Sequence, residues 1–580
     1  MSVGRGNGSN VSAGREGTMT DVRFPISGVA HVGRDDAARY LAGGDWVLNA
    51  AGDFLRETAQ RFPDKAALVS RDRRLGYGEW DEASERLGAA LLGLGLEPGD
   101  RALFQMGTVV ETAIALFGCF KAGIIPVCTL PQHREIEIGE LSARSNAKAH
   151  FVQADFSGFD LAGFAQSMAA RQPAMRNIIV ARGAAPAGTL SFDALIDGVS
   201  LPEARRRLAG VAIGTEDVLA FQLSGGTTGA PKIIPRFHGE YIGYARHWTR
   251  RLRLTHGDVL IWTLPLIHNA GQGSMLIPAV LAGATVVLMQ RMEARTYFEW
   301  IENERVTVAL SIGPIAAHVL EYQDLARHDI GSLRLFMSLN RAEAIEAHLG
   351  VTCMNFFGIS EGILMASEPD APAAARFGTI GRPAAATDEI KLIEIGGQRE
   401  VPLGTIGELT FRGPSTTRGY HCMAEASGSS FTVDGFFRTG DVMKAHLIEG
   451  RVYYSFEGRL KDNIDRGGEK FGAEEIEDII AGHPGVADVK AVAMPDRVYG
   501  ERVCACLIMR PGHRLPSVAE LGQFLSRRGL AKFKWPERIE GIDAFPVTRV
   551  GKVDKAALRS KIAEKIRSEE TQAVTNTRAR

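Results

Sequence analysis

Short apolar runs alternate with amphipathic segments over much of the chain, from about residue 53 to residue 337. The apolar runs predict strands at residues 101–105, 124–129, 177–180, 259–264, 285–288 and 308–311. Between them, segments such as 77–94 and 109–122 repeat apolar residues at helical spacing. Strands that alternate with helices are typical of an α/β architecture with largely parallel sheets.

The pattern changes in the last third of the chain. From residue 388 to residue 412 the helical period disappears, and short strands with turns predict a small β-rich subdomain. After the charged segment 458–462, the pattern predicts a helix at 473–481, strands at 487–494 and 503–509, and a helix at 518–527. This last group has the size of a compact domain.

We therefore divide the chain into two folded domains with short ends. Residues 46–460 are predicted to form a large N-terminal core of two αβ-layered subdomains plus the β-rich subdomain, and residues 461–570 a small α+β C-terminal domain. Residues 1–45 are expected to be disordered or extended, because the first twenty are rich in Gly, Ser and Asn. The polar residues 571–580 are expected to fray.

Composition excludes several classes of protein. A hydrophobic content of 45%, a charged content of 23% and a net charge of −1 are ordinary for a globular protein and give no reason to expect nucleic acid or a membrane as a partner. No apolar stretch approaches the ~18 residues that a membrane span needs. The six cysteines are too few for a disulfide scaffold and have no zinc-site spacing. We expect a cytoplasmic protein with reduced thiols.

A loop at residues 223–232 carries the first chemical signal. It contains three glycines, three hydroxyl side chains and one lysine, namely Gly225, Gly226, Gly229, Ser224, Thr227, Thr228 and Lys232. Glycines let backbone N–H groups approach an anion, hydroxyls donate hydrogen bonds and lysine adds a positive charge, so this composition suits a polyphosphate. The spacing is not that of a Walker A loop. On its own, such a loop is more often a solvated turn, and the motifs that follow it favour the phosphate-binding interpretation.

Further motifs follow this loop in a fixed order. They are the segments 357–362, 407–409 with 418–420, 434–441, 458–462, 466–470 and 550–553. Taken together, the motifs resemble those of the adenylate-forming superfamily, which contains acyl- and aryl-CoA ligases, peptide-synthetase adenylation domains and luciferases. The resemblance covers about residues 46–562.

Within this superfamily the chain is most similar to stand-alone aryl-acid adenylating enzymes, which activate 2,3-dihydroxybenzoate or salicylate for siderophore synthesis. The likeness is carried by residues 232–238, by the pair His268-Asn269, by residues 466–470 and by the ending 551–553. Amino-acid-activating domains have an aspartate at the position of Asn269, which holds the ammonium group of the substrate. A neutral asparagine suits the ortho hydroxyl or amine of an aryl acid instead.

The resemblance implies a first half-reaction in which a carboxylate attacks the α-phosphate of ATP and gives an acyl-adenylate and pyrophosphate. Two anions must meet, so cations and N–H donors are needed. Thr227, Thr228 and Lys232 are expected to hold the β- and γ-phosphates, with Ser224, Gly225, Gly226, Gly229 and Gly358 around the nucleotide. Glu361 is expected to bind Mg²⁺, Asp441 the ribose hydroxyls, Arg459 the ribose or a phosphate, and Lys552 both the carboxylate and the α-phosphate.

The resemblance also implies a second half-reaction after a rotation of the C-terminal domain. Lys461 would be the hinge, and the rotation would replace Lys552 by the loop that carries Gly467, Gly468 and Lys470. The acceptor is then expected to be the phosphopantetheine thiol of a separate carrier protein, because the sequence contains no carrier attachment site of the Asp/Gly-His-Ser-Leu type. Free CoA is the alternative acceptor, and the sequence does not decide between them. A non-catalytic nucleotide-binding homologue is a third reading, which intact Lys232, Glu361, Asp441 and Lys552 disfavour.

The predicted acyl pocket departs from the siderophore enzymes at two places. Its candidate residues are His268, Asn269, Ala270, Ser274, Ser338, Leu339 and Asn340. The siderophore enzymes have an aromatic residue where this chain has Ala270, and a Gly-Gly-Ala turn where it has Ser338-Leu339-Asn340. Ser274 matches their serine. We expect a pocket that is wider near Ala270 and filled near Leu339, for a small aromatic or heteroaromatic acid whose identity stays open, as does the oligomeric state.

Overall fold

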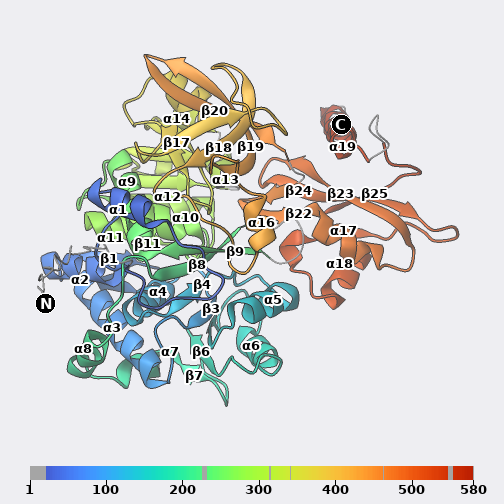
Figure 1. Cartoon of the computed structure of the whole chain (residues 1–580). Helices are drawn as coiled ribbons and strands as arrows, with labels where there is room; N and C mark the ends of the chain where they lie inside the picture. Colours follow the sequence, from blue (N-terminus) through green and yellow to red (C-terminus); the bar gives the residue numbers. More distant parts are fainter. Residues whose placement is uncertain are drawn as a thin grey trace, which may run out of the picture.

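The computed structural model describes residues 21–224, 231–312, 315–339, 341–460, 463–546 and 553–578, without the side chains of Arg459, Lys470 and a few others inside these ranges (Figure 1). Strands within these ranges form four sheets. Two are mainly parallel, one is antiparallel and one, in the C-terminal domain, is mixed. The predicted α/β class, with a large N-terminal and a small C-terminal domain, is confirmed.

The first sheet runs parallel from β7 to β8, and only β9 is antiparallel. Its order is β7 (Leu190–Ser191), β6 (Asn177–Ala181), β5 (Ala149–Gln153), β3 (Arg101–Gln105), β4 (Ile125–Val127), β8 (Val218–Ser224) and β9 (Lys232–Phe237). The connection from Ser224 to Lys232 is the predicted phosphate loop. The loop is therefore flanked on both sides by strands, β8 and β9, that pair with each other in this sheet.

The second sheet is parallel in its centre and antiparallel at both edges. Its order is β16 (Arg382–Pro383), β15 (Leu364–Ala366), β14 (Cys353–Gly358), β13 (Leu335–Ser338), β12 (Val308–Ser311), β10 (Val259–Trp262), β11 (Thr285–Leu288), β1 (Ala66–Val69) and β2 (Arg74–Gly76).

Helices cover both of these sheets. They are α1 (Arg34–Ala42), α2 (Ala51–Arg61), α3 (Tyr77–Gly93), α4 (Val110–Ala122), α5 (Glu135–Ser145), α6 (Leu161–Ala169), α7 (Phe192–Asp197), α8 (Leu201–Ala209), α9 (His238–Arg251), α10 (Asn269–Gly271), α11 (Ile277–Ala282), α12 (Ala294–Asn303), α13 (Ile315–Glu321), α14 (Ala342–Leu349) and α15 (Ala373–Gly378). A π-helical turn at Gln272–Leu276 joins α10 to α11.

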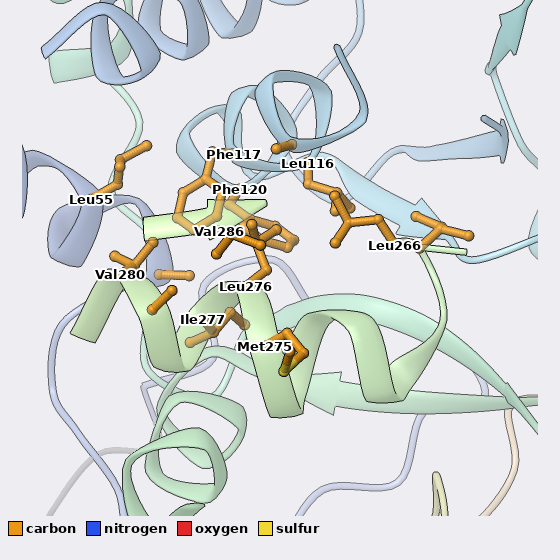
Figure 2. Close-up of a cluster of buried hydrophobic side chains, with 14 of the residues drawn as sticks. Leu55, Leu116, Phe117, Phe120, Leu266, Met275, Leu276, Ile277, Val280 and Val286 are labelled. Carbon is orange, nitrogen blue, oxygen red and sulfur yellow. The ribbon is translucent and has the colours of Figure 1, made fainter. Parts of the chain in front are cut away.

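Helix α4 is buried along its whole length. Its rings Phe117 and Phe120 pack among Leu55 of α2, Val280 of α11 and Val286 of β11 (Figure 2). A helix that is apolar on all sides must be enclosed, and α4 accordingly belongs to the main core, which joins elements of both sheets.

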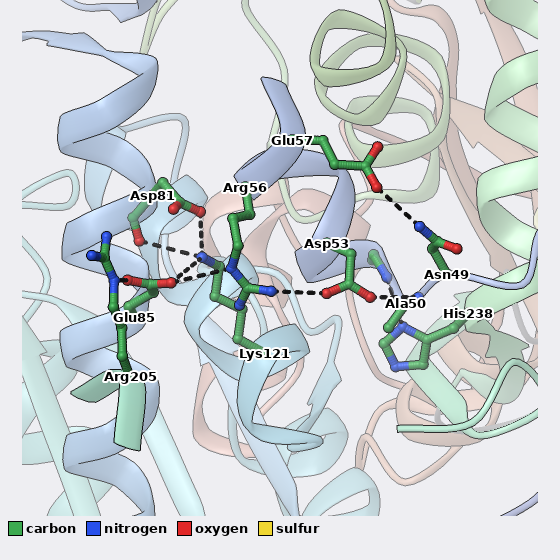
Figure 3. Close-up of polar contacts among 11 residues, drawn as sticks. Asn49, Ala50, Asp53, Arg56, Glu57, Asp81, Glu85, Lys121, Arg205 and His238 are labelled. Carbon is green, nitrogen blue, oxygen red and sulfur yellow. Dashed lines mark hydrogen bonds and ion pairs between the residues drawn. The ribbon is translucent and has the colours of Figure 1, made fainter. Parts of the chain in front are cut away.

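The charged end of α4 is neutralised inside the protein (Figure 3). Lys121, with 1% of its side chain exposed, pairs with Asp81 of α3 and lies 3.8 Å from Glu85. Glu85 also forms ion pairs with Arg56 of α2, at 3.3 Å, and with Arg205 of α8, at 2.9 Å. Burial lowers the pKa of Lys121 and raises that of Asp81. Buried charges must be paired, so this network fixes the relative positions of four helices.

The last two sheets form the β-rich subdomain and the C-terminal domain. The first is β17 (Glu389–Ile393), β18 (Ile406–Arg412), β19 (Phe437–Ile448) and β20 (Arg451–Arg459), with α16 (Ala424–Gly428) beside it. The second is β22 (Glu469–Gly472), β21 (Asn463–Arg466), β24 (Gly500–Met509), β23 (Val486–Asp496) and β25 (Arg538–Gly541), with α17 (Ala473–Ala481), α18 (Val518–Arg527) and α19 (Lys555–Arg578).

The expectations for the two ends of the chain need correction. Residues 34–42 form helix α1 rather than an extended segment, because Tyr40 packs on the ring of Trp46, whose indole Nε1 donates to the Pro414 carbonyl at 2.8 Å. At the other end α19 continues to Arg578, through most of the segment expected to fray. No helix within the described ranges combines the length and hydropathy needed to cross a membrane.

Candidate active site

A cavity of about 640 Å³ lies where the N-terminal core meets the C-terminal domain. Its walls come from both mainly parallel sheets, the β-rich subdomain and the hairpin β21–β22. The predicted site residues that line it are Ser224, Lys232, His268, Asn269, Ala270, Ser274, Leu339, Gly358, Glu361, Asp441 and Gly468. Segments far apart in the sequence are thus brought to one place.

Other predicted site residues are placed differently. Ser338 is buried at the end of β13 and Gly467 lies in the β21–β22 turn, and neither lines the cavity. Gly225, Gly226, Thr227, Thr228, Gly229, Asn340, Lys461 and Lys552 lie outside the described residues, as do the side chains of Arg459 and Lys470.

Lys232, Tyr420 and Glu361 form a chain of contacts at one end of the cavity. The ammonium of Lys232, the first residue of β9, lies 4.3 Å from the centre of the Tyr420 ring. The Tyr420 hydroxyl donates to Glu361 Oε1 at 3.1 Å. Burial raises the pKa of Tyr420 far above its ordinary value, and the Glu361 charge adds to the rise. The phenol therefore stays protonated at neutral pH and fixes one carboxylate oxygen of Glu361.

The backbone around Glu361 is held from both sides. Arg236, buried and paired with Glu240, donates from Nη1 to the Ser360 carbonyl at 2.9 Å. Gly362 has φ +127°, and a Cβ there would lie 1.7 Å from the Ser415 carbonyl oxygen. The turn after β14 therefore accepts only glycine at this position, and Arg236 braces it.

Asp441 marks the next part of the wall. This buried carboxylate lies on β19, opposite Arg459 of β20 in the register. Its N–H donates to Thr439 Oγ1 at 3.0 Å, and the neighbouring Gly440 N–H donates to Glu408 Oε1 at 3.3 Å. Glu408 is itself buried and ion-paired with Arg438. The backbone that carries Asp441 is thus fixed before any ligand binds.

Asn269 and Ser274 are the polar groups at the opposite end of the cavity. Asn269 Oδ1 accepts from the Tyr241 hydroxyl at 2.8 Å, and the Tyr244 ring, which lines the cavity, stacks on the Tyr241 ring at 5.7 Å. Ser274 lies in the π-helical turn, an irregularity that occurs frequently at functional sites. His268 Nδ1 accepts from the Ala270 N–H at 3.2 Å and so caps this short helix.

The walls around these polar groups are apolar and aromatic. Ala270 and Leu339 are half-buried and pack on the main core, and further lining residues are Cys128, Tyr244, Ile312, Phe356 and Leu364. Such a wall suits a flat ring with one or two polar substituents. Both departures from the siderophore pattern, at Ala270 and Leu339, thus lie on this surface.

The turn of the hairpin β21–β22 forms the side of the cavity that belongs to the C-terminal domain. Gly467 and Gly468 have φ of +67° and +95°. Gly468 donates to Asp465 Oδ1 at 2.9 Å, and a Cβ on Gly468 would lie 2.6 Å from Ile312 Cγ2. The turn therefore touches the N-terminal core closely. The adjoining Glu469 has its pKa raised to about 7, by burial and then by the Asp465 charge, against the effect of Lys534.

Comparison with known families identifies the chain. Residues 55–421 match the model described as AMP-binding enzyme, and residues 475–552 match the AMP-binding enzyme C-terminal domain. The chain belongs to the AMP-binding enzyme family. The predicted superfamily is thereby confirmed.

Individual relatives of this AMP-binding enzyme match it over most of their length. A 2,3-dihydroxybenzoate-AMP ligase of Bacillus subtilis is 36% identical over 91% of the chain and 97% of its own length. A salicylyl-CoA synthase / salicylate adenylyltransferase of a Streptomyces species is 35% identical over 93% of the chain and 98% of its own length. The apo structure of MbtA from Mycobacterium smegmatis has 33% identity and a TM-score of 0.69, and covers 92% of the chain and 98% of itself.

Sequence reasoning missed three residues that shape this AMP-binding enzyme's cavity. Tyr420 and Arg236 were seen only as parts of motifs, although a charged residue between the apolar positions of β9 was a signal that Arg236 has a buried partner. Tyr244, which lines the cavity, carried no signal, because the helix α9 that presents it is separate from the acyl-pocket motifs.

Proposed function

We propose that this AMP-binding enzyme is an ATP-dependent aryl-acid AMP ligase. It activates an aromatic or heteroaromatic carboxylic acid as the acyl-adenylate, with release of pyrophosphate, and passes the acyl group to the phosphopantetheine thiol of a separate carrier protein. The observation that carries the proposal is the single cavity. It joins a charged end with Lys232, Glu361 and Asp441 to an apolar end with Asn269. Relatives at 35–36% identity, named for 2,3-dihydroxybenzoate and salicylate, support it.

The charged end has the groups that the first half-reaction needs. Carboxylate and α-phosphate repel each other, and preorganised cations such as Lys232 reduce that repulsion in the transition state. The buried carboxylate of Asp441 is suited to accept hydrogen bonds from the two ribose hydroxyls. Lys552, which lies outside the described residues, is assigned to the reacting carboxylate on its motif alone.

Mg²⁺ fits this site as an ion shared with the nucleotide. The described residues contain no group of three or more His, Cys, Asp or Glu side chains arranged to hold a metal. Glu361 is one of the carboxylates that line the cavity, and its Oε1 accepts the Tyr420 hydroxyl, whose ring lies under Lys232. Mg²⁺ typically takes one or two protein carboxylates together with phosphates and water. When bound there, the ion would neutralise charge on the phosphates.

Free CoA is the second candidate acceptor of the acyl group, and the name of one relative supports it. The Streptomyces relative is named both a salicylyl-CoA synthase and a salicylate adenylyltransferase. Carrier protein and CoA present the same pantetheine arm, so the cavity accommodates the reacting thiol of either in the same way.

ATP–pyrophosphate exchange over a panel of benzoates, picolinates, anthranilates and fatty acids tests the proposal. Exchange is expected with aromatic acids and not with fatty acids, and Asp441→Asn should reduce it strongly. Thioester formation is then followed by mass spectrometry with a holo carrier protein or with CoA. The assignment would be refuted if none of the tested acids supported exchange, or if fatty acids supported it best.

A further inference from the structure

A buried lysine joins the two domains of this enzyme. Lys534 lies in a 3₁₀ turn, Lys532–Lys534, of the C-terminal domain, and its side chain is 3% exposed. Its ammonium lies 2.9 Å from Glu137 Oε1 of helix α5, in the N-terminal core, and 2.9 Å from each carboxylate oxygen of Glu475 at the start of α17. Glu137 and Glu475 are 0% and 5% exposed. Helix α5 lies on the side of the core that faces α17 and α18 (Figure 1).

The pair of Lys534 and Glu137 is ionised at neutral pH. Burial alone would raise the pKa of Glu137, but the Lys534 charge, together with the smaller effects of His133 and of hydrogen bonds to the carboxylate, brings the pKa below its ordinary value. Burial alone would lower the pKa of Lys534, but Glu137 and then Glu475 outweigh it and the pKa is raised. The adjacent His133 remains neutral, because burial lowers its pKa to about 4. The second carboxylate, Glu475, has a raised pKa, mainly through burial.

The cluster is connected to the cavity through the hairpin β21–β22. Glu475 follows strand β22 by three positions, and the Phe471 ring of β22 meets the Phe533 ring edge-on at 5.7 Å. Phe533 adjoins Lys534 and faces the His133 ring of the core at 6.3 Å. A cluster that holds Lys534 and Glu475 against α5 therefore also holds the hairpin, and with it Gly468 against Ile312.

The Lys534–Glu137 pair connects the two domains in their present orientation. Removing one partner of a buried pair leaves an uncompensated charge, which is strongly unfavourable. Any rotation that separated Lys534 from Glu137 would incur this cost unless both groups reached water. The interaction therefore favours the arrangement with the hairpin at the cavity.

We propose that Glu137 and Lys534 are positioning residues for the second half-reaction. They hold the Gly467–Gly468 turn at the mouth of the acyl site while the thiol attacks, without touching the reacting atoms. The proposal rests on the proposed function, because it assigns the present orientation to thiol transfer. The attack forms the carbon–sulfur bond, breaks the acyl–phosphate bond and releases AMP together with the thiol proton.

The decisive variant is Glu137→Gln. Glutamine keeps the acceptor that caps α5, where Glu137 Oε2 receives the Arg134 N–H at 3.0 Å, but removes the charge that faces Lys534. Glu321→Gln is the matched control, because Glu321 forms an exposed ion pair between the domains with Arg497 at 3.2 Å. Exposed pairs contribute little.

Two rates are measured for each variant. ATP–pyrophosphate exchange reports the first half-reaction, and single-turnover thioester formation from supplied acyl-adenylate reports the second. Glu137→Gln should slow thioester formation roughly tenfold or more, as when a gating arrangement is lost, and leave exchange within about twofold. Glu321→Gln should change neither. The double variant Glu137→Gln with Lys534→Met completes the comparison. Because the pair acts as a unit, its thioester formation should be slowed by a smaller factor than the product of the factors for the two single variants.

Two results would overturn the inference. One is an equal loss of both half-reactions in Glu137→Gln, which marks a general structural role. The other is normal thioester formation in that variant. Failure of the proposed function is a separate outcome, since the wild-type chain would then show no exchange with any aromatic acid.

Discussion

The hydroxyl of Tyr420 donates a hydrogen bond to Glu361 Oε1 at 3.1 Å. The same tyrosine ring lies beneath the ammonium of Lys232. One aromatic side chain thus contacts both a cation and a carboxylate. Both charged groups line the cavity, where the phosphates and Mg²⁺ are expected.

Tyr420→Phe tests the contact between the tyrosine hydroxyl and Glu361. The variant keeps the ring under Lys232 and removes the donor to Glu361, so the carboxylate loses one fixed orientation. We expect kcat for pyrophosphate exchange to fall about tenfold and the Mg²⁺ requirement to rise, since a charge-assisted hydrogen bond contributes about 1.5–3 kcal/mol. Tyr322→Phe, which removes a hydroxyl bonded to His328 away from the cavity, is the control. Unchanged exchange in Tyr420→Phe would show that Glu361 needs no such support.

Lys552→Ala separates the two half-reactions. Because the motif at 550–553 assigns Lys552 to the reacting carboxylate, the variant should lose acyl-adenylate formation. Thioester formation from supplied adenylate should persist, since the proposed arrangement for that step places the hairpin β21–β22, and not Lys552, at the cavity. The measurement pairs pyrophosphate exchange with single-turnover thiolation. Loss of both activities to the same degree would contradict a division of labour between Lys552 and the hairpin.

The acyl pocket should respond to restoration of the siderophore-type residues. Ala270→Tyr with Leu339→Gly adds a ring where the wall is now small and removes bulk on the facing segment. We expect the ratio of kcat/KM for salicylate to that for the preferred acid to rise by roughly tenfold or more, as a ring-sized change in a pocket allows. Asn269→Ala should lower activity in both backgrounds. A wild-type preference for 2,3-dihydroxybenzoate over every other acid would contradict the argument.

Buried histidines should make the fold sensitive to mild acid. His150 of β5 is 0% exposed, and burial lowers its pKa to about 3. The unfolded chain binds the proton near pH 6.5, so stability is complete above that pH and falls as the pH drops toward the folded-state pKa. At pH 5.5 the loss is about 1.4 kcal/mol for one such histidine.

Urea unfolding at pH 7.5 and 5.5 measures this loss. Between pH 7.5 and pH 5.5, the free energy of unfolding should fall by about 1.4 kcal/mol less in His150→Leu than in the wild type. The exposed His256→Leu serves as the control and should lose as much as the wild type. Equal losses for His150→Leu and wild type would show that His150 does not contribute to acid sensitivity.

Local patterns predicted many elements closely, and the failures have a common cause. Helices α17 and α18 begin and end where their periodicity does, because each buries one apolar stripe on the C-terminal sheet. Helix α1 was missed because its partner surface comes from Trp46 and, through it, from the distant Pro414. The polar residues 571–580 were expected to fray, yet helix α19 continues to Arg578, and its first turns pack Leu558 and Ile562 on β23.

The sequence by itself determined the order of strands and helices, the composition of the phosphate loop and the series of motifs that indicates the family. These features depend on neighbouring residues and on local backbone preference. Only the tertiary structure decided that Tyr420 contacts both Lys232 and Glu361, and that Lys534 meets Glu137 across the domains. Such pairs join segments far apart in the chain, and they form because enclosing a charge requires a partner. No local pattern specifies which partner the fold will bring.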